Sequence, residues 1–443
     1  MRVVSLPVNA ESPGARWASL AMRDHLRRRH RAERRFRRAG VVAIGLALVG
    51  LATLLASIAW NGWSAFRATE IQLDVVFDRA LFEGAADASP EERETLLAGA
   101  DYAALVRNAL RAQFPEVDGR QALRELAGLV SSGAREELRA AVIADPALIG
   151  SSRTWWLPAD DEVDLYRKRG VAHGVAEGDR HLSDAQLAWI DQLADRGRLR
   201  SAFATRFLTS GDSRDPELAG IWGAVVGSFL TLVVTLSLVF PLGVSAAVYL
   251  EEFAPRNRAT DLIEVNINNL AAVPSIVFGL LGLAVFLGFF GLPRSAPLVG
   301  GLTLALMTLP TVIITARVAI AAVPPSIREA ARGLGASPLQ VVLHHVLPLA
   351  MPGILTGTII GMARALGETA PLLMIGMVAF IVDVPHGIRD AATALPVQIF
   401  LWADSPERAF VEKTSGAILV LLGFLVAMNG TAIWLRRRFE KSW

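Results

Sequence analysis

Residues 324–353 read PPSIREAARGLGASPLQVVLHHVLPLAMPG and lie between two long apolar runs. The first half of this segment predicts a short polar helix. Ser326 and Glu329 have the spacing of a capping box, in which each side chain satisfies a backbone N–H at the start of a helix. Gly333 and Gly335 are expected to end this helix, since glycine is common just after a last helical turn.

The second half of the segment predicts a second helix. Ser337 is expected to cap it with Pro338 at its first helical position, and Pro348 is expected to end it. Four apolar residues at helical spacing would line one face of this helix, namely Leu339, Val342, Leu343 and Val346. Such a face suits contact with a membrane domain or with a groove on a partner. Residues 324–353 are therefore predicted to form a helical hairpin.

The composition of the whole chain indicates a membrane protein. Of its 443 residues 53% are apolar and 19% are charged, and the mean hydropathy is +0.41, which is typical of a polytopic membrane protein. A run of about 20 apolar residues can cross a hydrocarbon core about 30 Å thick. Six such runs are present, at residues 41–63, 220–249, 270–291, 297–322, 351–382 and 414–435.

Basic residues predict the orientation of these six spans. Residues 1–39 contain eleven Arg and only three acidic residues. If the spans alternate, further basic residues flank them on the same side, namely Arg256, Arg258, Arg328, Arg332 and the run Arg436–Arg438. The positive-inside rule then predicts that both termini are cytoplasmic.

Residues 64–218 have the charge of a soluble protein, with 19 basic and 27 acidic residues. The stretch EIQLDVVF at 70–77 alternates apolar and polar residues, as a half-buried strand does. SPEE at 89–92 and SDAQ at 183–186 are capping boxes that predict helices. These patterns predict an extracytoplasmic α+β domain. The adjacent Trp155 and Trp156 fit its hydrophobic core better than the alternative, a binding platform.

The helical hairpin predicted at residues 324–353 resembles the EAA loop of bacterial ABC importer permeases. The matching positions are Glu329, Ala330, Ala331, Gly335, Leu347 and Pro348. One departure is His345, which stands where that family usually has an aliphatic residue. The resemblance implies the type I importer permease fold, an all-α polytopic membrane domain, and a cytoplasmic coupling loop that docks into a groove on a separate ATPase subunit.

Three further segments are similar to PstA-type permeases of the phosphate-specific importer. They are VYLEEFAP at 248–255, NNLAAVPSIVFGLLGL at 268–283 and RALGETAPL at 364–372. The similarity implies a non-catalytic permease of inorganic phosphate in the bacterial inner membrane. It also implies a second, PstC-type permease, PstB-type ATPase subunits that bind ATP and Mg²⁺, and a PstS-type periplasmic binding protein. No cofactor, metal or nucleic acid is expected on this chain itself.

The chain is accordingly expected to divide into five parts. A basic cytoplasmic N-terminus (1–40) precedes a first transmembrane helix (41–63) and the extracytoplasmic domain (64–218). The permease domain follows (219–436), with its cytoplasmic coupling loop at 323–350 and a cytoplasmic tail at 437–443.

Other functions fit the sequence less well. The three lysines are Lys168, Lys413 and Lys441, and none follows a glycine as a Walker A phosphate loop requires. A permease for another oxyanion, such as molybdate or sulfate, would keep the EAA loop without being expected to carry RALGETAPL. A secondary transporter would need ion-coupling groups of its own. A membrane-anchored phosphate sensor would need a cytoplasmic output domain.

Arg364 and Glu368 stand four residues apart in the apolar run 351–382. A charge at the centre of a membrane helix costs at least about 2.5 kcal/mol, so such a pair needs a reason. It either locks helices together or, with Thr369 as a further donor, lines the path of the anion. Small residues recur every four positions before it, at Gly353, Gly357 and Gly361. They predict a ridge for helix packing, with the charged pair beside it on a helical wheel.

Overall fold

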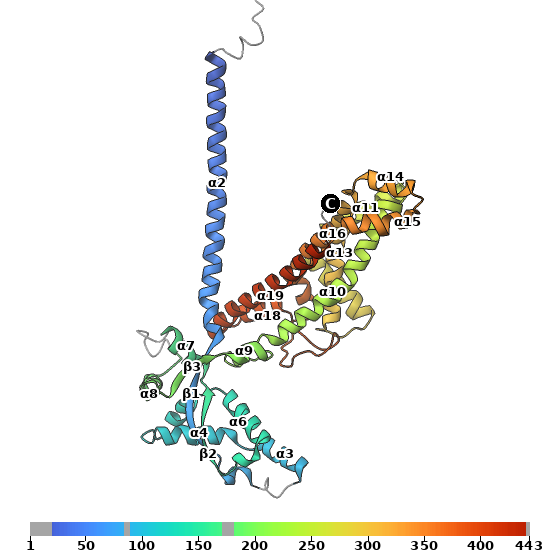
Figure 1. Ribbon diagram of the computed structural model, residues 1–443. Coiled ribbons are helices and arrows are strands. Elements are labelled where there is room, and N and C mark those ends of the chain that lie inside the picture. The colour runs from blue at the N-terminus through green and yellow to red at the C-terminus, as the bar shows by residue number, and fades with distance from the viewer. Residues whose placement is uncertain (1–19, 84–88, 171–180, 440–443) are drawn as a thin grey trace, which may run out of the picture. The chain divides into compact units, whose positions relative to one another are not determined.

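The computed structural model describes residues 20–83, 89–170 and 181–439, and the chain separates into two units, residues 1–60 and 61–443. The first unit holds most of helix α2 (Leu20–Trp63), drawn in blue in Figure 1. Its Arg-rich half, from Arg27 to Arg38, is exposed along its whole length. The apolar half that follows belongs to a helix long and apolar enough to cross a membrane.

Residues 67–203 contain a three-stranded antiparallel sheet (Figure 1). Its strands are β1 (Arg67–Val76), β2 (Ser152–Pro158) and β3 (Leu199–Phe203), and β1 lies between the other two. Ile71 pairs with Leu157 on one side and with Leu199 on the other. The predicted alternation at 70–77 is confirmed, because the inward side chains are fully buried, namely Ile71, Leu73 and Val75 of β1 and Phe77 directly after it.

Helices complete the core of this domain, and some of them contact the sheet. They are α3 (Pro90–Gly99), α4 (Tyr102–Gln113), α5 (Arg120–Ala127), α6 (Gly133–Ala144), α7 (Asp161–Arg169) and α8 (Asp184–Asp195). Both predicted capping boxes are confirmed, at Ser89 with Glu92 and at Ser183 with Gln186. Helices α4 and α7 contact β1, and α6 contacts β2. Residues 67–203 thus form the small α+β domain that the sequence predicts.

The prediction for the two adjacent tryptophans is half right. Trp155 packs edge-on against Phe77, with ring centroids 6.3 Å apart, and joins the core. Trp156 is not a core residue, because the guanidinium of Arg200 lies over its ring at 4.3 Å. Neighbouring residues of a strand point to opposite faces of the sheet, so one core tryptophan excludes the other.

The rest of the described chain is mostly helical. Its long helices are α10 (Trp222–Val248), α13 (Pro297–Ala321), α16 (Leu347–Leu366) and α19 (Ala409–Phe439). Shorter ones are α9 (Thr205–Thr209), α11 (Arg258–Ala271), α12 (Ser275–Gly282), α17 (Ala370–Met374) and α18 (Leu395–Ala403). Among the described residues five helices are long and apolar enough to span a membrane, or six if one bent pair is a single span.

The bent pair replaces the straight span predicted at 270–291. Helix α11 ends at Ala271, and α12 continues through a π-helical stretch (Leu283–Phe289) after a bend of 100°. Pro274 explains the break, because proline offers no N–H for a helical bond and disfavours a helical conformation in the residue before it. The apolar run at 270–291 is therefore continuous in sequence, but it does not form one continuous helix.

The predicted span 351–382 is wrong at both ends. Its helix begins earlier, within a helical stretch of 29 residues from Pro338 to Leu366, and stops at Gly367. Apart from α17, residues 367–394 have irregular backbone, with Gly376 at φ +90°. Irregular backbone is tolerated among membrane helices where protein satisfies it. Here Ser295 Oγ donates to Gly376 O at 2.6 Å, and Leu298 N donates to Ile388 O at 2.9 Å.

Candidate functional site

The hairpin predicted at residues 324–353 is present in part. Helix α14 (Pro325–Gly333) is followed by Gly335 at φ +89°, a backbone conformation that favours glycine. The predicted capping box at Ser326 is wrong, because Pro324 is the capping residue and no side chain caps this helix. Two consecutive prolines start the helix two residues earlier, since a proline at the first helical position loses no hydrogen bond.

The second helix of the hairpin begins as predicted but does not end at Pro348. Ser337 and Gln340 form a capping box, and α15 (Pro338–Val341) starts with Pro338. The chain then widens into a π-helical turn (Val342–Val346) and continues without interruption into α16. A proline removes the N–H that an α-helix would use. The local change to the i→i+5 pattern just before Pro348 explains how the helix continues.

Only half of the apolar stripe predicted on this second helix is buried. Val342 and Val346 are buried, whereas Leu339 and Leu343 remain 57% and 48% exposed. Of the residues that resemble the EAA loop, Ala331 is buried, Leu347 and Pro348 are half-buried, and three are exposed, namely Glu329, Ala330 and Gly335. The hairpin thus has one buried side and an open side with exposed leucines.

The glycine ridge of α16 packs against α13, the arrangement that the spacing predicts. A Cβ atom on Gly357 would lie 2.1 Å from Thr315 Oγ1, and one on Gly353 would lie 2.7 Å from Ala319 Cβ. At Gly361 the corresponding distance to Thr308 Cγ2 is 3.2 Å. The two helices approach most closely where glycine leaves room for the facing side chain.

Arg364 and Glu368 lie just beyond this ridge. Arg364 Nε and Glu368 Oε1 are 3.5 Å apart, and the two side chains are 56% and 19% exposed. Because α16 ends at Leu366, Glu368 lies outside the helix. The helical-wheel position predicted for Glu368 is therefore wrong, although the turn after the helix brings the carboxylate to the arginine. Thr369 follows at the start of α17 and is half-buried.

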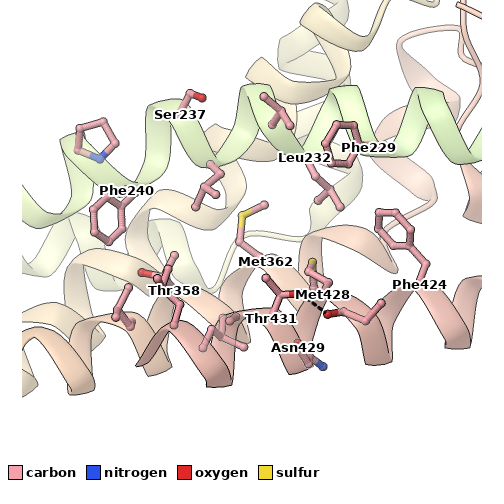
Figure 2. Close-up of a pocket in the computed structure, with 18 residues that line it drawn as sticks. Phe229, Leu232, Ser237, Phe240, Thr358, Met362, Phe424, Met428, Asn429 and Thr431 are labelled. Carbon is pink, nitrogen blue, oxygen red and sulfur yellow. Dashed lines mark hydrogen bonds between the residues drawn. The ribbon is translucent and has the colours of Figure 1, made fainter. Parts of the chain in front are cut away.

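A groove of about 680 Å³ lies between α10, α16 and α19. Figure 2 shows Phe229 and Leu232 of α10 opposite Phe424 and Met428 of α19, with Met362 of α16 between them. Its few polar groups include Ser237, Thr358, Asn429 and Thr431. Neither Arg364 nor Glu368 lines this groove, so the apolar groove and the charged pair are separate features.

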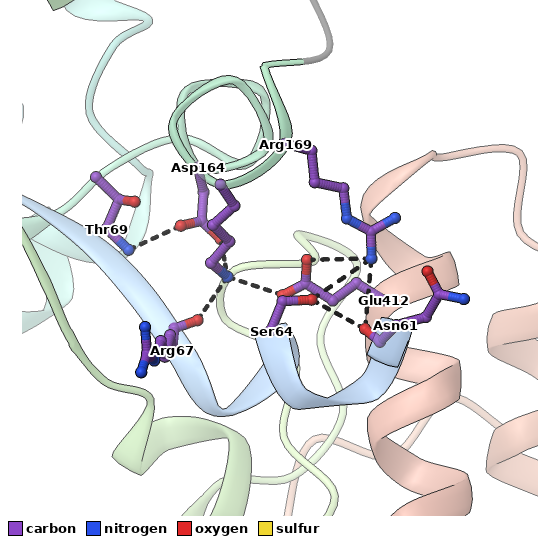
Figure 3. A network of polar contacts seen from close by, with 8 residues as sticks. Asn61, Ser64, Arg67, Thr69, Asp164, Arg169 and Glu412 are labelled. Atoms are coloured by element: carbon purple, nitrogen blue, oxygen red, sulfur yellow. Dashed lines mark hydrogen bonds and ion pairs between the residues drawn. The ribbon is translucent and has the colours of Figure 1, made fainter. Parts of the chain in front are cut away.

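An ion-pair network joins the α+β domain to the start of α19 (Figure 3). Lys168 Nζ lies 2.6 Å from Asp164 Oδ2 and 2.8 Å from Glu412 Oε1, and it donates to Arg67 O at 2.6 Å. Arg169 adds a second contact with Glu412, at 3.7 Å. The Glu412 side chain is only 4% exposed. The network thus fastens α7 and β1 to a membrane helix.

Sequence reasoning did not find this network, because Lys168 and Glu412 are 244 positions apart. The one signal available was the pair Glu412–Lys413 directly before the apolar run 414–435. Charges at that edge are common on membrane helices and do not identify a partner.

A second group of acids lies at the start of α7. Burial, together with the nearby carboxylate of Asp161, raises the pKa of Asp160 to about 7. Burial also raises the pKa of Glu217, although a hydrogen bond from Ser131 opposes this effect. Among the described residues no group of His, Asp and Glu side chains has the geometry of a metal site.

The apolar helices, the closely packed α13 and α16, and the hairpin between them are the features of a polytopic membrane domain. Residues 239–442 match the family described as binding-protein-dependent transport system inner membrane component. Residues 23–177 match a domain of unknown function, DUF3333.

The chain belongs to the PstA family of phosphate transport system permeases. It is 34% identical to "Phosphate transport system permease protein PstA 1" of Mycobacterium tuberculosis over 219 residues, which are 49% of this chain and 70% of that protein. It is 30% identical to PstA of Haemophilus influenzae over 229 residues, 52% of this chain and 79% of that protein.

Among solved structures, the chain is similar to an inward-facing form of the MetNI methionine ABC transporter. The identity is 18% and the TM-score 0.41, over 50% of this chain and 98% of that one. The family match and the apolar helices make the chain a multi-pass membrane protein with a permease domain and an additional α+β domain.

Proposed function

We propose that this chain is the permease subunit of an ATP-driven importer of inorganic phosphate. The observation that carries the proposal is the position of Arg364, an exposed cation directly after a close helix-packing ridge, within the RALGETAPL segment of a PstA family member. An arginine binds phosphate through parallel N–H donors in a planar fork. Family membership supports phosphate as the anion that this fork meets.

The geometry of the pair suits passage of an anion rather than its retention. Glu368 Oε1 lies 3.5 Å from Arg364 Nε, and the Arg364 side chain remains 56% exposed, so its guanidinium is accessible to a passing phosphate. The carboxylate partly neutralises the arginine, which weakens anion binding. A transport path needs binding weak enough to permit release. Thr369 supplies a nearby hydroxyl donor.

The same proposal assigns partners to the other surfaces. A second permease subunit completes the path, and ATPase subunits bind the exposed side of α14, where Glu329 and Ala330 lie. A periplasmic binding protein delivers phosphate from outside. Both termini are cytoplasmic in this arrangement, residues 64–218 are extracytoplasmic, and residues 323–350 form the cytoplasmic coupling loop. ATP is hydrolysed by the partner, and this chain is non-catalytic.

Exchange of the two charges tests the path. The variant carries Arg364→Glu together with Glu368→Arg and is compared with Arg364→Lys, which keeps the positive charge in place. We expect the exchanged variant to lose phosphate uptake while it still copurifies with the ATPase, and Arg364→Lys to retain part of the uptake. Wild-type uptake by the exchanged variant would show that the pair only locks helices together.

A competition experiment tests whether the substrate is phosphate or another oxyanion. Uptake of labelled phosphate by the wild-type complex is measured with an excess of unlabelled molybdate or sulfate. We expect unlabelled phosphate to compete and the other two anions not to compete. Stronger competition by molybdate or sulfate would favour the alternative, a permease for that oxyanion.

A further inference from the structure

Arg328 on α14 joins three separate elements. Its Nη2 and Nε donate to Glu252 Oε1 at 2.7 and 3.0 Å. Its Nη1 donates to Val323 O at 2.5 Å, and Nη2 also donates to Ile320 O at 2.9 Å. Glu252 lies in the π-helical turn (Tyr249–Phe253) that ends α10, and Ile320 lies in the last turn of α13. One guanidinium therefore connects α14 to the ends of α10 and α13.

The contact requires an arginine. The last carbonyls of a helix carry the negative end of its dipole, and Ile320 O accepts from Val323 N as well as from Arg328. A guanidinium has five donors in a fixed plane and can bind two carbonyls and a carboxylate together. Both side chains are shielded, with Arg328 16% and Glu252 7% exposed, so their attraction is screened less than that of a surface pair.

Apolar burial restrains α14 only in part. Ala331 is its one buried residue, and Ile327 packs partly against the same apolar cluster. The chain enters α14 through the short segment Ala322–Pro324 and leaves it through Gly335, which has a positive φ. Both connections can act as hinges. The polar contacts of Arg328 are thus a major restraint on how α14 moves relative to α10 and α13.

We propose that Arg328 is a positioning residue that makes α14 move as one body with α10 and α13. A displacement of α14 by a bound ATPase would then reach the membrane helices instead of being absorbed at the two hinges. The inference rests on the proposed function, in which α14 is the element that the ATPase contacts. It adds the specific contact through which movement is transmitted.

A nearby ion-pair group does not provide the same link. Arg317 on α13 lies 2.9 Å from Glu264 on α11 and 3.4 Å from Glu251. This group includes no residue of α14. Its side chains are also more exposed, at 25% for Arg317 and 34% for Glu264. Glu251 and Glu252 are adjacent, yet only Glu252 is bonded to the hairpin.

The first test compares the same conservative change at two neighbouring arginines. Arg328→Lys keeps the charge but loses the planar fork, and Arg317→Lys makes the same change in the ion-pair group that includes no residue of α14. The complete importer is reconstituted in vesicles, and phosphate taken up per ATP hydrolysed is measured. We expect this ratio to fall roughly fivefold or more in Arg328→Lys, a typical coupling between sites, and to stay unchanged in Arg317→Lys. An unchanged ratio in Arg328→Lys would overturn the proposal.

A merely structural role would lower the yield or melting temperature of the complex but leave the ratio of uptake to hydrolysis intact. If Arg328→Lys does not assemble, Glu252→Gln replaces it, because the amide keeps the shape and an acceptor oxygen while removing the charge. The same fall in the ratio is expected. An assembled Glu252→Gln complex with the wild-type ratio would overturn the proposal.

The second test does not depend on the substrate. Spin labels are placed at Ser326→Cys on α14 and Leu242→Cys on α10, both exposed positions, and their distance is measured with and without ATP and vanadate. We expect a constant distance in the otherwise wild-type complex and a nucleotide-dependent distance in Arg328→Lys. A constant distance in both would overturn the link. Absence of phosphate uptake by the wild type would refute the proposed substrate alone.

Discussion

Gly357→Ala is the most direct test of how α16 packs on α13. The added methyl group would lie 2.1 Å from Thr315 Oγ1 and 2.4 Å from Thr315 Cβ. Rotation of the threonine side chain can move the hydroxyl but not the Cβ atom, which is attached to the backbone of α13. The two helices must therefore move apart at this point, and the neighbouring contacts along the ridge are weakened.

The expected effect follows from two opposing contributions. Overpacking of a close contact costs about 1–3 kcal/mol. Alanine in place of glycine within a helix returns about 0.5–1 kcal/mol. Gly357→Ala should therefore destabilise the protein by up to about 2.5 kcal/mol.

The other helical glycines form a graded series with Gly357. A Cβ atom would lie 2.7 Å from the nearest atom at Gly353, 3.2 Å at Gly361, and more than 4 Å from any atom at Gly423 on α19. Gly353→Ala should cost less than Gly357→Ala. Gly361→Ala should be nearly neutral, and Gly423→Ala, the matched control, should stabilise slightly.

The assay is thermal unfolding of the four purified full-length variants in one detergent, read as an apparent melting temperature. A change of 1 kcal/mol moves the melting temperature by roughly 2–4 °C in a domain of 150–250 residues. The order of melting temperatures should be Gly423→Ala, Gly361→Ala, Gly353→Ala, Gly357→Ala, from highest to lowest. Equal melting temperatures, or Gly357→Ala at the top of the series, would refute the close approach of α16 and α13.

Three further predictions concern topology, coupling and pH. Single cysteines at positions 120 and 400 should react with an impermeant reagent from outside, whereas those at 30, 258 and 332 should react only after permeabilisation; outside labelling at 332 would contradict the topology. Gly335→Ala should lower the phosphate taken up per ATP hydrolysed, because Gly335 has a φ of +89°, which alanine adopts only with strain. Gly333→Ala, within α14, should leave this ratio unchanged, and equal ratios in the two variants would exclude a role for Gly335 in coupling. Burial raises the pKa of Asp160 from an ordinary 3.8 to about 7, so below pH 7 the folded protein holds this proton more tightly than the unfolded chain does. The contribution of Asp160 to stability should therefore fall as the pH rises from 4 to 7, by up to about 4 kcal/mol. Asp160→Asn should weaken the dependence of the melting temperature on pH, and the same pH dependence as in the wild type would contradict the role given to Asp160.

Local patterns in the sequence predicted local structure well. The alternation of apolar and polar residues at 70–77 correctly predicted a strand, because such a strand has only one way to place its apolar face on a core. Ser89 and Ser183 begin helices because a capping box involves residues only three positions apart. The close packing at Gly353 and Gly357 was also predictable, since a spacing of four residues places small side chains on one face.

Predictions failed where the sequence does not show whether a helix ends or continues. An apolar run does not reveal whether its helix stops, so the end of α16 at Leu366 and the irregular segment after it were missed. Pro348 usually marks a helix end, but a π-helical turn before it allows the helix to continue. Long-range partners could not be identified from the sequence. Arg328 bonds Glu252 across 76 positions, and either residue alone is an ordinary charge near a membrane surface.

The α+β domain shows how an additional domain can be accommodated in a membrane protein. Its first strand, β1, and its last, β3, are antiparallel neighbours, with Arg67 paired to Phe203. Just outside the sheet, Ala204 N donates to Phe66 O at 2.9 Å. The chain therefore enters and leaves the domain at two adjacent points, the arrangement that insertion into an existing connection requires. Lys168 and Glu412 fasten the same end of the domain to α19, so its placement depends on a buried ion pair as well as on its two covalent connections.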